Sequence, residues 1–326
     1  MMKPLAALKL SCALALAALA TLATAPVLAQ STLQVIAQQP PGSGSDAFTR
    51  AWADCVARQT GESTVVLNRP GANGILAINN LKNLPADGRA VMTIGMSQMT
   101  ITPFVHKRQP YDPLEDFDHI ALVGTSPLVL TVPAELGVND LAGLVRFAES
   151  VPGGLMFGSP GKGSPAHLLT TALAKDRSMP ATHVPFVGEA SGLNALLGQH
   201  IHAMTLVIGT AAPQVRAGRL VPLAVFAAER SSLLPEVPTI IEAGGPEILA
   251  RPAWLAVVAR KGTPPEAIAK LNEATNQCMD DETYVKLMTM MNTTLVRSKP
   301  EDVRRYAERY IAVWKPLIDE LGLVAE

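Results

Sequence analysis

Short apolar runs alternate with longer amphipathic segments along most of the chain. Apolar runs bounded by glycine, proline or asparagine are typical of buried strands, and apolar residues spaced three and four apart are typical of helices. The pattern predicts strands at residues 33–37, 64–67, 91–96, 119–123, 128–132, 155–158, 183–186, 201–208, 220–227 and 254–259. It predicts helices at residues 47–60, 75–83, 139–150, 168–174, 190–197 and 301–321, a helix ending at 214–217, and a long helical tail from 264 to 290. This alternation predicts an α/β fold with mainly parallel sheets.

The turn after the first predicted strand, residues 39–46, reads QPPGSGSD and leads into a predicted helix. Glycine lets the backbone approach a ligand closely, and the unpaired N–H groups and the dipole of a helix N-terminus favour an anion. Ser45 is expected to cap this helix and Gly61 to end it. The turn is therefore predicted to form one half of a binding site for a small carboxylate.

A second turn of the same kind, residues 159–167, reads SPGKGSPAH. Gly161 and Gly163 allow close backbone approach, Ser164 can cap the following helix, and Pro165 suits its first position. Two such turns suggest two lobes that each offer a helix N-terminus to a ligand. Ser97 joins the candidates because it follows the strand at 91–96, and ligands of open α/β sheets bind at the carboxyl ends of strands.

The first 29 residues have the pattern of a secretory signal peptide. Lys3 and Lys9 accompany an alanine- and leucine-rich run, and Val27-Leu28-Ala29 fits a small-residue cleavage site. A membrane anchor is disfavoured because the apolar run is short and interrupted by threonine and proline. The remainder is long enough for roughly two domains. We expect a soluble, exported chain.

Composition excludes several other functions. The net charge of −1 and the absence of a basic cluster indicate neither a nucleic-acid partner nor an anionic membrane surface. No CxxC, HExxH, Walker or EF-hand pattern is present, so no metal or cofactor is expected. Cys55 and Cys278 lie in amphipathic patterns and are interpreted as two buried helical thiols. An exported compartment would permit a disulfide, and their spacing does not show whether they meet.

Two enzyme interpretations compete with this binding site. Residues 42–47 match the loose dinucleotide pattern GxGxxA, but a Rossmann domain needs an acid after its second strand, where this chain has Asn68 and Arg69. Ser164 lies near His167, as a hydrolase nucleophile and base would, but no GxSxG pattern is present. A capping serine in the first turn of a helix explains this pair better.

Two further groups of candidate residues also have ordinary explanations. His200 and His202 would share one face of an extended segment, yet no third and fourth zinc ligand is visible, so a solvated pair is favoured. Asp46 could be a carboxylate base, but an aspartate in a first helical turn ordinarily compensates the helix dipole.

The residues together resemble a known family. The chain is similar to the periplasmic solute-binding proteins of tripartite tricarboxylate transporters, the Bug-type receptors. The similarity covers nearly all of the chain after the signal peptide. It is carried by PPGSGSD at 40–46, NRPGANG at 68–74, YDPLEDF at 111–117, GSPGKGSPAH at 158–167, LPEVPTIIEAG at 234–244 and KGTPP at 261–265.

The resemblance implies a two-lobed α/β fold of the periplasmic binding protein type, a Venus flytrap with the ligand cleft between the lobes. Residues 30–127 and 250–326 would form one lobe, and 128–249 the other. It implies a monomeric receptor without catalysis or cofactor, which passes a small organic carboxylate to membrane subunits of the transporter. Carried over by position, the ligand-binding candidates are Gln39, Pro41, Gly42, Ser43, Gly44, Ser45, Asp46, Ser97, Gly163, Ser164, His167, Thr205, Leu206 and Val207.

The chain departs from the family pattern at two places. Gln39 stands where relatives usually have an aromatic residue, and Thr205-Leu206-Val207 stand where they often have Phe-Asp-Asn. Because that aspartate is the natural partner of a ligand ammonium group, we predict a ligand without an amine. Two alternatives stay open: an exported hydrolase with a loop serine, and a sensor or scaffold protein with a degenerate pocket.

Overall fold

The computed structural model describes residues 32–324, so the predicted signal peptide lies outside the described part of the chain. Two mixed β-sheets and their flanking helices form one compact unit from Thr32 onward. The first sheet has the order β11 (Thr294–Leu295), β4 (Phe117–Ser126), β10 (Ala253–Arg260), β3 (Ala90–Gly95), β1 (Thr32–Ala37), β2 (Ser63–Asn68). The second sheet has the order β7 (Ala181–Pro185), β6 (Leu155–Ser159), β8 (Ala203–Val207), β5 (Leu128–Pro133), β9 (Leu220–Val225).

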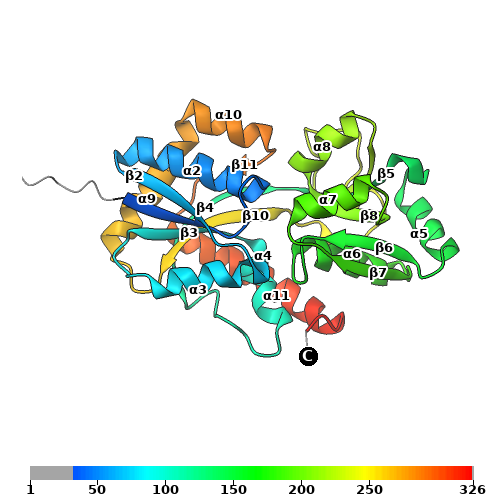
Figure 1. Ribbon diagram of the computed structural model, residues 1–326, viewed down its shortest axis with the longest axis horizontal. Coiled ribbons are helices and arrows are strands. Elements are labelled where there is room, and N and C mark those ends of the chain that lie inside the picture. Colours follow the sequence, from blue (N-terminus) through cyan, green and yellow to red (C-terminus); the bar gives the residue numbers. More distant parts are fainter. Residues whose placement is uncertain (1–31, 325–326) are drawn as a thin grey trace, which may run out of the picture. The chain divides into compact units, whose positions relative to one another are not determined.

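Helices flank both sheets, as Figure 1 shows. The elements associated with the first sheet are α2 (Gly44–Thr60), η1 (Ala72–Gly74), α3 (Ile75–Asn83), α4 (Met96–Thr100), η2 (Thr102–Val105), α9 (Pro265–Gln277), η5 (Cys278–Asp280), α10 (Glu282–Met290) and α11 (Pro300–Glu320). The segment between β5 and β10 contains η3 (Ala134–Leu136), α5 (Leu141–Ser150), α6 (Pro165–Asp176), α7 (Glu189–Leu197), α8 (Ile208–Arg216) and η4 (Glu247–Leu249). The predicted α/β class is therefore confirmed.

The expectation of mainly parallel sheets is wrong. In the first sheet β1 pairs in parallel with β2 and β3, but β10 runs antiparallel to both β3 and β4. In the second, β6 pairs in parallel with β7 and β8, whereas β5 is antiparallel to β8 and β9. A strand buried on both faces has the same apolar run in either direction, so the sequence pattern does not report pairing direction.

The centre of the first sheet is fully buried, which explains its continuous apolar runs. All six residues of β3 are buried, and its Met92 and Ile94 contribute to a large hydrophobic cluster. Only Pro127 separates β4 of the first sheet from β5 of the second. The division into lobes at residues 127/128 and 249/250 stays a prediction.

The long helical tail is broken rather than continuous. Helix α9 ends at Gln277, and α10 begins after Asp281, whose side chain accepts a hydrogen bond from the Tyr284 N–H at 2.8 Å. An aspartate in extended conformation that accepts from the third residue of a helix is an N-cap. Asp281 therefore starts a new helix in a region that the apolar periodicity alone predicted to be continuous.

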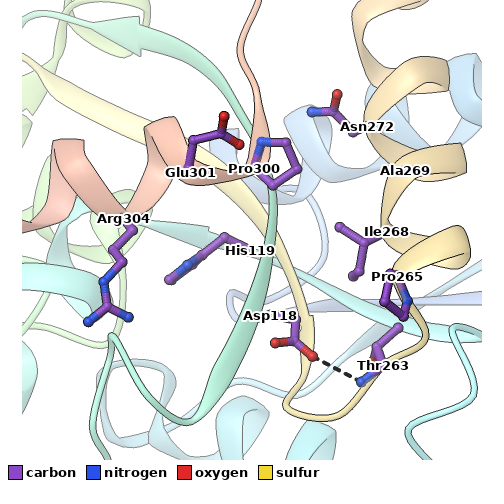
Figure 2. A pocket seen from close by; sticks show the side chains of 10 residues that line it. All are labelled: Asp118, His119, Thr263, Pro265, Ile268, Ala269, Asn272, Pro300, Glu301 and Arg304. Atoms are coloured by element: carbon purple, nitrogen blue, oxygen red, sulfur yellow. Dashed lines mark hydrogen bonds between the residues drawn. The ribbon is translucent and has the colours of Figure 1, made fainter.

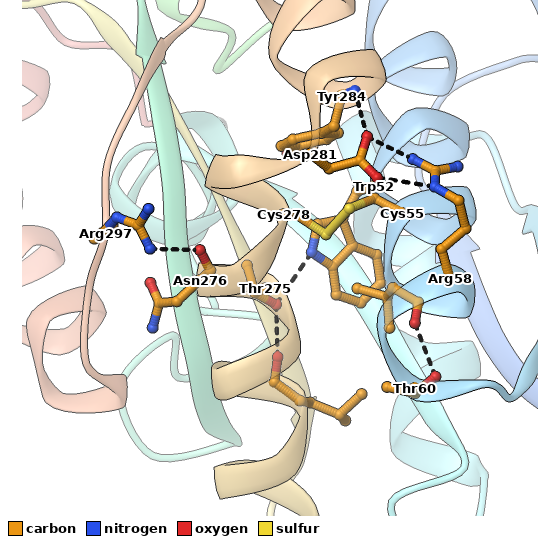
Figure 3. The surroundings of a disulfide bond; sticks show 12 residues. Trp52, Cys55, Arg58, Thr60, Thr275, Asn276, Cys278, Asp281, Tyr284 and Arg297 are labelled. Carbon is orange, nitrogen blue, oxygen red and sulfur yellow. Dashed lines mark hydrogen bonds and ion pairs between the residues drawn. A yellow bond between two sulfur atoms is a disulfide. The ribbon is translucent and has the colours of Figure 1, made fainter.

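Cys55 and Cys278 form a disulfide between α2 and η5, with their Cα atoms 5.9 Å apart. The prediction that both are buried is confirmed, but the expectation of two free thiols is wrong. Figure 3 shows two further ties beside the bridge. Arg58 donates two hydrogen bonds of 2.9 Å to Asp281, and Trp52 Nε1 donates to Thr275 Oγ1 at 3.2 Å. The helix that follows the first glycine-rich turn is thus fastened to the C-terminal tail.

Within residues 32–324, none of the helices has the length and apolar character needed to cross a bilayer.

Candidate functional site

The first glycine-rich turn is ordered by its own serine and aspartate. Ser43 has extended backbone angles, and its Oγ accepts a hydrogen bond from the Asp46 N–H at 3.2 Å. Ser43, and not Ser45 as predicted, is therefore the N-cap of α2. Ser45 lies inside the first helical turn, where its carbonyl accepts a hydrogen bond from Thr49 Oγ1 at 2.8 Å. Gly61 ends the helix in the left-handed conformation, as predicted.

The Asp46 carboxylate closes this turn. It accepts hydrogen bonds from the Gly42 N–H at 2.9 Å, from Asn68 Nδ2 at 2.7 Å and from Arg50 Nε at 3.0 Å. Burial by itself would raise the pKa of Asp46, but the hydrogen bonds from Arg50, Asn68 and Gly42 together hold it below its usual value. Because donors from the loop, from β2 and from α2 all engage the carboxylate, Asp46 positions the turn, in which Pro41, Gly42 and Gly44 are exposed.

A polar network joins the carboxyl edge of the first sheet to the second turn. Ser97 Oγ, in the helix after β3, donates to the Gly163 carbonyl at 2.9 Å. Asn73 Nδ2 donates to Ser97 Oγ at 2.9 Å and to Thr102 Oγ1 at 2.8 Å. Ser97 thus stands at a strand end as predicted and ties the second turn to that edge of the first sheet. Asn73 and Thr102 were missed, although Asn73 lies in the NRPGANG segment that carried the resemblance.

Gly163 fits its place only as a glycine. Its φ is +74°, a conformation that side-chain-bearing residues rarely adopt, and an added Cβ would lie 2.8 Å from Val105 Cγ2. Its N–H donates to His167 Nδ1 at 3.3 Å. The next residue, Ser164, caps α6 by accepting from the His167 N–H at 3.3 Å, and Pro165 occupies the first helical position. Both predictions for the start of α6 are confirmed.

A stacked pair of histidines, His167 buried and His183 half-buried, packs against the second turn. The rings of His167 and His183 stack with their centroids 3.9 Å apart, beside Phe157. His183 Nε2 lies 2.7 Å from Ser159 Oγ, which also donates to the Gly161 carbonyl at 2.9 Å. Burial first, then neighbouring positive charge, lowers the pKa of His167 to about 3 and that of His183 to about 4. Both rings are therefore neutral at physiological pH.

The end of β8 differs from what the sequence led us to expect. Thr205 is fully buried and its hydroxyl lies 2.9 Å from Thr170 Oγ1, while Leu206 is fully buried in a hydrophobic cluster. Of the three residues predicted here, only Val207 keeps exposed surface. The side chains of Thr205 and Leu206 therefore present no surface, contrary to what a ligand-contacting side chain needs.

An acid that the sequence analysis overlooked stands at this strand end. Glu189, the first residue of α7, accepts a hydrogen bond on Oε2 from the Val207 N–H at 3.0 Å. Burial raises the pKa of its carboxyl, and hydrogen bonds from Thr210 and Val207 oppose that shift only in part. The end of β8 therefore has an acid, Glu189, although the aspartate of the family pattern is missing. Gly188, the residue before Glu189, lies close to Gln39 of the first turn, since a Cβ added to Gly188 would be 3.6 Å from Gln39 Oε1.

The arrangement does not form a nucleophile with a base. Ser164 Oγ accepts from the His167 backbone, while the His167 ring accepts from Gly163. Ser159, which does contact the ring of His183, is fully buried. In the other histidine pair, His202 is also engaged, since its Nδ1 accepts from the Met156 N–H at 3.0 Å. Within residues 32–324, no group of His, Cys, Asp or Glu side chains has the arrangement of a metal site.

A pocket of about 490 Å³ lies elsewhere on the first sheet, among β4, α9 and α11 (Figure 2). Its Asp118 carboxylate accepts from the N–H groups of Gly262 at 2.7 Å and Thr263 at 2.9 Å. Burial lowers the pKa of His119, which also lines the pocket. None of the predicted site residues lines this pocket. The candidate site is therefore assigned to the turns at the strand ends, where polar groups converge from both sheets.

Comparison with known proteins identifies the family and the fold. The model of the tripartite tricarboxylate transporter family receptor matches residues 48–323. Protein BugT of Bordetella pertussis is 31% identical over 298 residues, which cover 89% of each chain. Among solved structures, R. palustris Rpa4515 with adipate has a TM-score of 0.84 at 27% identity and covers 89% of this chain and 97% of that one. MatC from Rhodopseudomonas palustris with bound malate has a TM-score of 0.82 at 25% identity and covers 88% and 98%.

Proposed function

The chain belongs to the tripartite tricarboxylate transporter family of receptors, and we propose that it captures a small organic carboxylate in the periplasm for a transporter of that type. The signal peptide would comprise residues 1–29. The ligand would be held between a lobe of residues 30–127 and 250–326 and a lobe of residues 128–249. We propose that the protein works as a monomer without catalysis, and that closure on the ligand creates the surface that the membrane subunits recognise.

One observation carries the proposal: a hydrogen bond ties the turn before the serine-capped helix α6 to the carboxyl edge of the first sheet, the same edge at which β1 leads into the serine-capped helix α2. Ser43 and Ser164 leave the remaining first-turn N–H groups of α2 and α6 available to an anion. Ser97 ties the second turn to the strand ends of the first sheet. Charge-assisted hydrogen bonds from these turns would supply affinity, and the side chains that line the ligand cleft would supply specificity.

The comparisons support a carboxylate as the ligand class. Rpa4515 and MatC carry adipate and malate in their solved structures. Both are amine-free acids, which agrees with the ligand proposed here. Glu189 qualifies the original reason for that proposal, because it brings a carboxyl to the end of β8. Burial raises the pKa of that carboxyl, and its Oε2 already accepts a hydrogen bond from the Val207 N–H.

The test is thermal unfolding of protein that has been denatured and refolded to strip retained ligand. The panel contains di- and tricarboxylates, aromatic acids, amino acids and amides. A ligand at about 100 times its Kd adds roughly 2.7 kcal/mol to the free energy of unfolding. The Ser97→Ala variant should reduce the shift, whereas Ser150→Ala should not, because Ser150 is an exposed serine at the end of α5.

Two results would contradict the proposal. The first is the absence of a shift with every acid of the panel, which would favour a sensor or scaffold with a degenerate pocket. The second is turnover of an ester or amide that the Ser164→Ala variant abolishes, which would favour a hydrolase. A receptor with the same substitution would only bind its ligand more weakly.

A further inference from the structure

Gln38 is an unassigned polar residue at the carboxyl edge of the first sheet. It directly follows β1, which pairs in parallel with β2 and β3. The carboxyl ends of all three strands therefore meet beside it, and ligands of α/β sheets bind at this edge. The second glycine-rich turn contacts the same edge, since Gly163 accepts from Ser97 just beyond β3.

The carboxamide of Gln38 is buried without a hydrogen-bond donor. The residue is 5% exposed, and Oε1 has no partner in the described part of the chain. The backbone of Gly74 passes close by, because an added Cβ there would lie 2.7 Å from this oxygen. Buried acceptors in native proteins nearly always have a hydrogen-bond partner, so the unpaired Gln38 Oε1 at the edge where ligands bind indicates a donor supplied by a ligand.

The neighbouring side chains are already engaged. Gln98 Nε2 donates to the Asn73 carbonyl at 3.0 Å, and Gln98 Oε1 accepts from the Gly95 N–H at 3.3 Å. Asn73 Nδ2 donates to Ser97 and Thr102. Other orphan atoms lie elsewhere: Tyr284 Oη and Trp314 Nε1 belong to residues of the hydrophobic clusters. The partner that Gln38 lacks is therefore not supplied by the side chains around it.

We propose that Gln38 Oε1 accepts a hydrogen bond from a hydroxyl group of the ligand, so that the receptor prefers hydroxycarboxylates to the same acids without the hydroxyl. This inference rests on the proposed function, since it takes the ligand to be a carboxylate in this site. Gln98, which lies beside Gln38 at Gly74, and the adjacent Asn73 are neutral amides, which suit a hydroxyl better than an ammonium ion. A ligand without the hydroxyl would leave Gln38 Oε1 buried and unpaired, and the free-energy cost of that lowers its affinity relative to the hydroxy acid.

Matched acid pairs test the proposal by calorimetric titration of refolded, ligand-free protein. The pairs are malate with succinate, citrate with tricarballylate, 2-hydroxyglutarate with glutarate, and 3-hydroxybutyrate with butyrate. In the pair that binds, the hydroxy acid should bind roughly tenfold more tightly, as one net hydrogen bond provides. Gln38→Met should bring that ratio close to one and leave the affinity for the acid without the hydroxyl nearly unchanged.

The matched control is Gln277→Met, which replaces an exposed glutamine at the end of α9 and should keep the wild-type ratio. Urea unfolding adds a second readout. Gln38→Met should unfold at the wild-type urea concentration or above it, because the substitution removes an unpartnered amide; a destabilised variant would mean that the amide has a structural partner. If acids bind but Gln38→Met leaves their ratios unchanged or weakens both members equally, only this inference fails. If no acid binds the wild-type protein, the proposed function fails with it.

Discussion

Removing the disulfide should destabilise the protein strongly without unfolding it. The bridge joins residues separated by 223 positions. On chain-entropy grounds, a cross-link that closes so long a loop contributes about 5 kcal/mol by restricting the unfolded chain. The double variant Cys55→Ala/Cys278→Ala should lose about that much. Arg58–Asp281 and Trp52–Thr275 remain to hold α2 against the tail.

The assay is urea unfolding followed by tryptophan fluorescence, since Trp52, Trp254 and Trp314 are all buried. With an m-value of ~3 kcal/mol/M, the loss should lower the midpoint by roughly 1.5 M. The m-value itself should rise, because an unfolded chain without the cross-link exposes more surface. Reduction of the wild-type protein should reproduce both changes, and the reductant should not affect the double variant.

A midpoint within ~0.3 M of the wild-type value would refute this reasoning, because the loss of loop-closure entropy requires a cross-link of this span to stabilise the folded state. Ligand affinity provides the internal control. Cys55 lies in α2 beyond the capped first turn, so the double variant should bind its acid as the wild type does under native conditions.

Three further predictions concern the site itself. Gly163→Ala should cost ~1–3 kcal/mol and weaken ligand binding, because the residue needs a positive φ and an added Cβ would press on Val105; urea midpoints and titration measure both. The free energy of unfolding should fall as the pH drops below about 6.5, because His167 and His183 bind protons in the unfolded chain but stay neutral in the folded protein. The loss should level off below the folded-state pKa values of about 3 and 4. Each histidine should account for ~2 kcal/mol at pH 5, and a flat midpoint between pH 7.5 and 5 would contradict this. Asp46→Asn should lower the free energy of unfolding by ~1–3 kcal/mol at pH 7 and weaken ligand binding. Unchanged stability and unchanged affinity would contradict the role of Asp46 in closing the turn.

The fold was largely predictable because its signals are local. Apolar runs found the strands β1 to β10 but missed the two-residue β11, and the helix at residues 75–83 has the predicted bounds. Pairing direction was not predictable, since β10 arrives from a distant part of the chain and reverses against β3. The break before α10 was missed because a single capping aspartate outweighs a continuous apolar pattern.

The site was predictable only where the backbone dictates it. Pro165 fixed the start of α6, so Ser164 could be identified as its cap. The first turn offers two serines two residues apart, and the choice of Ser43 depends on which hydroxyl reaches the Asp46 N–H. Glu189 and Gln38 could not be found from their spacing in the sequence. Tertiary packing brings Glu189 to the Val207 N–H and buries the Gln38 carboxamide oxygen without a partner.

The position of β10 has a consequence for how the protein is made. This strand separates β3 from β4 in the first sheet, although more than a hundred residues of the second sheet are synthesised between β4 and β10. Until residues 253–260 have emerged, β3 and β4 have no common partner and the sheet cannot close. Such late, non-local pairing is slow. A chain that completes its first sheet only near the end of its synthesis would stay unfolded longer, which is the state in which a polypeptide can be threaded across a membrane.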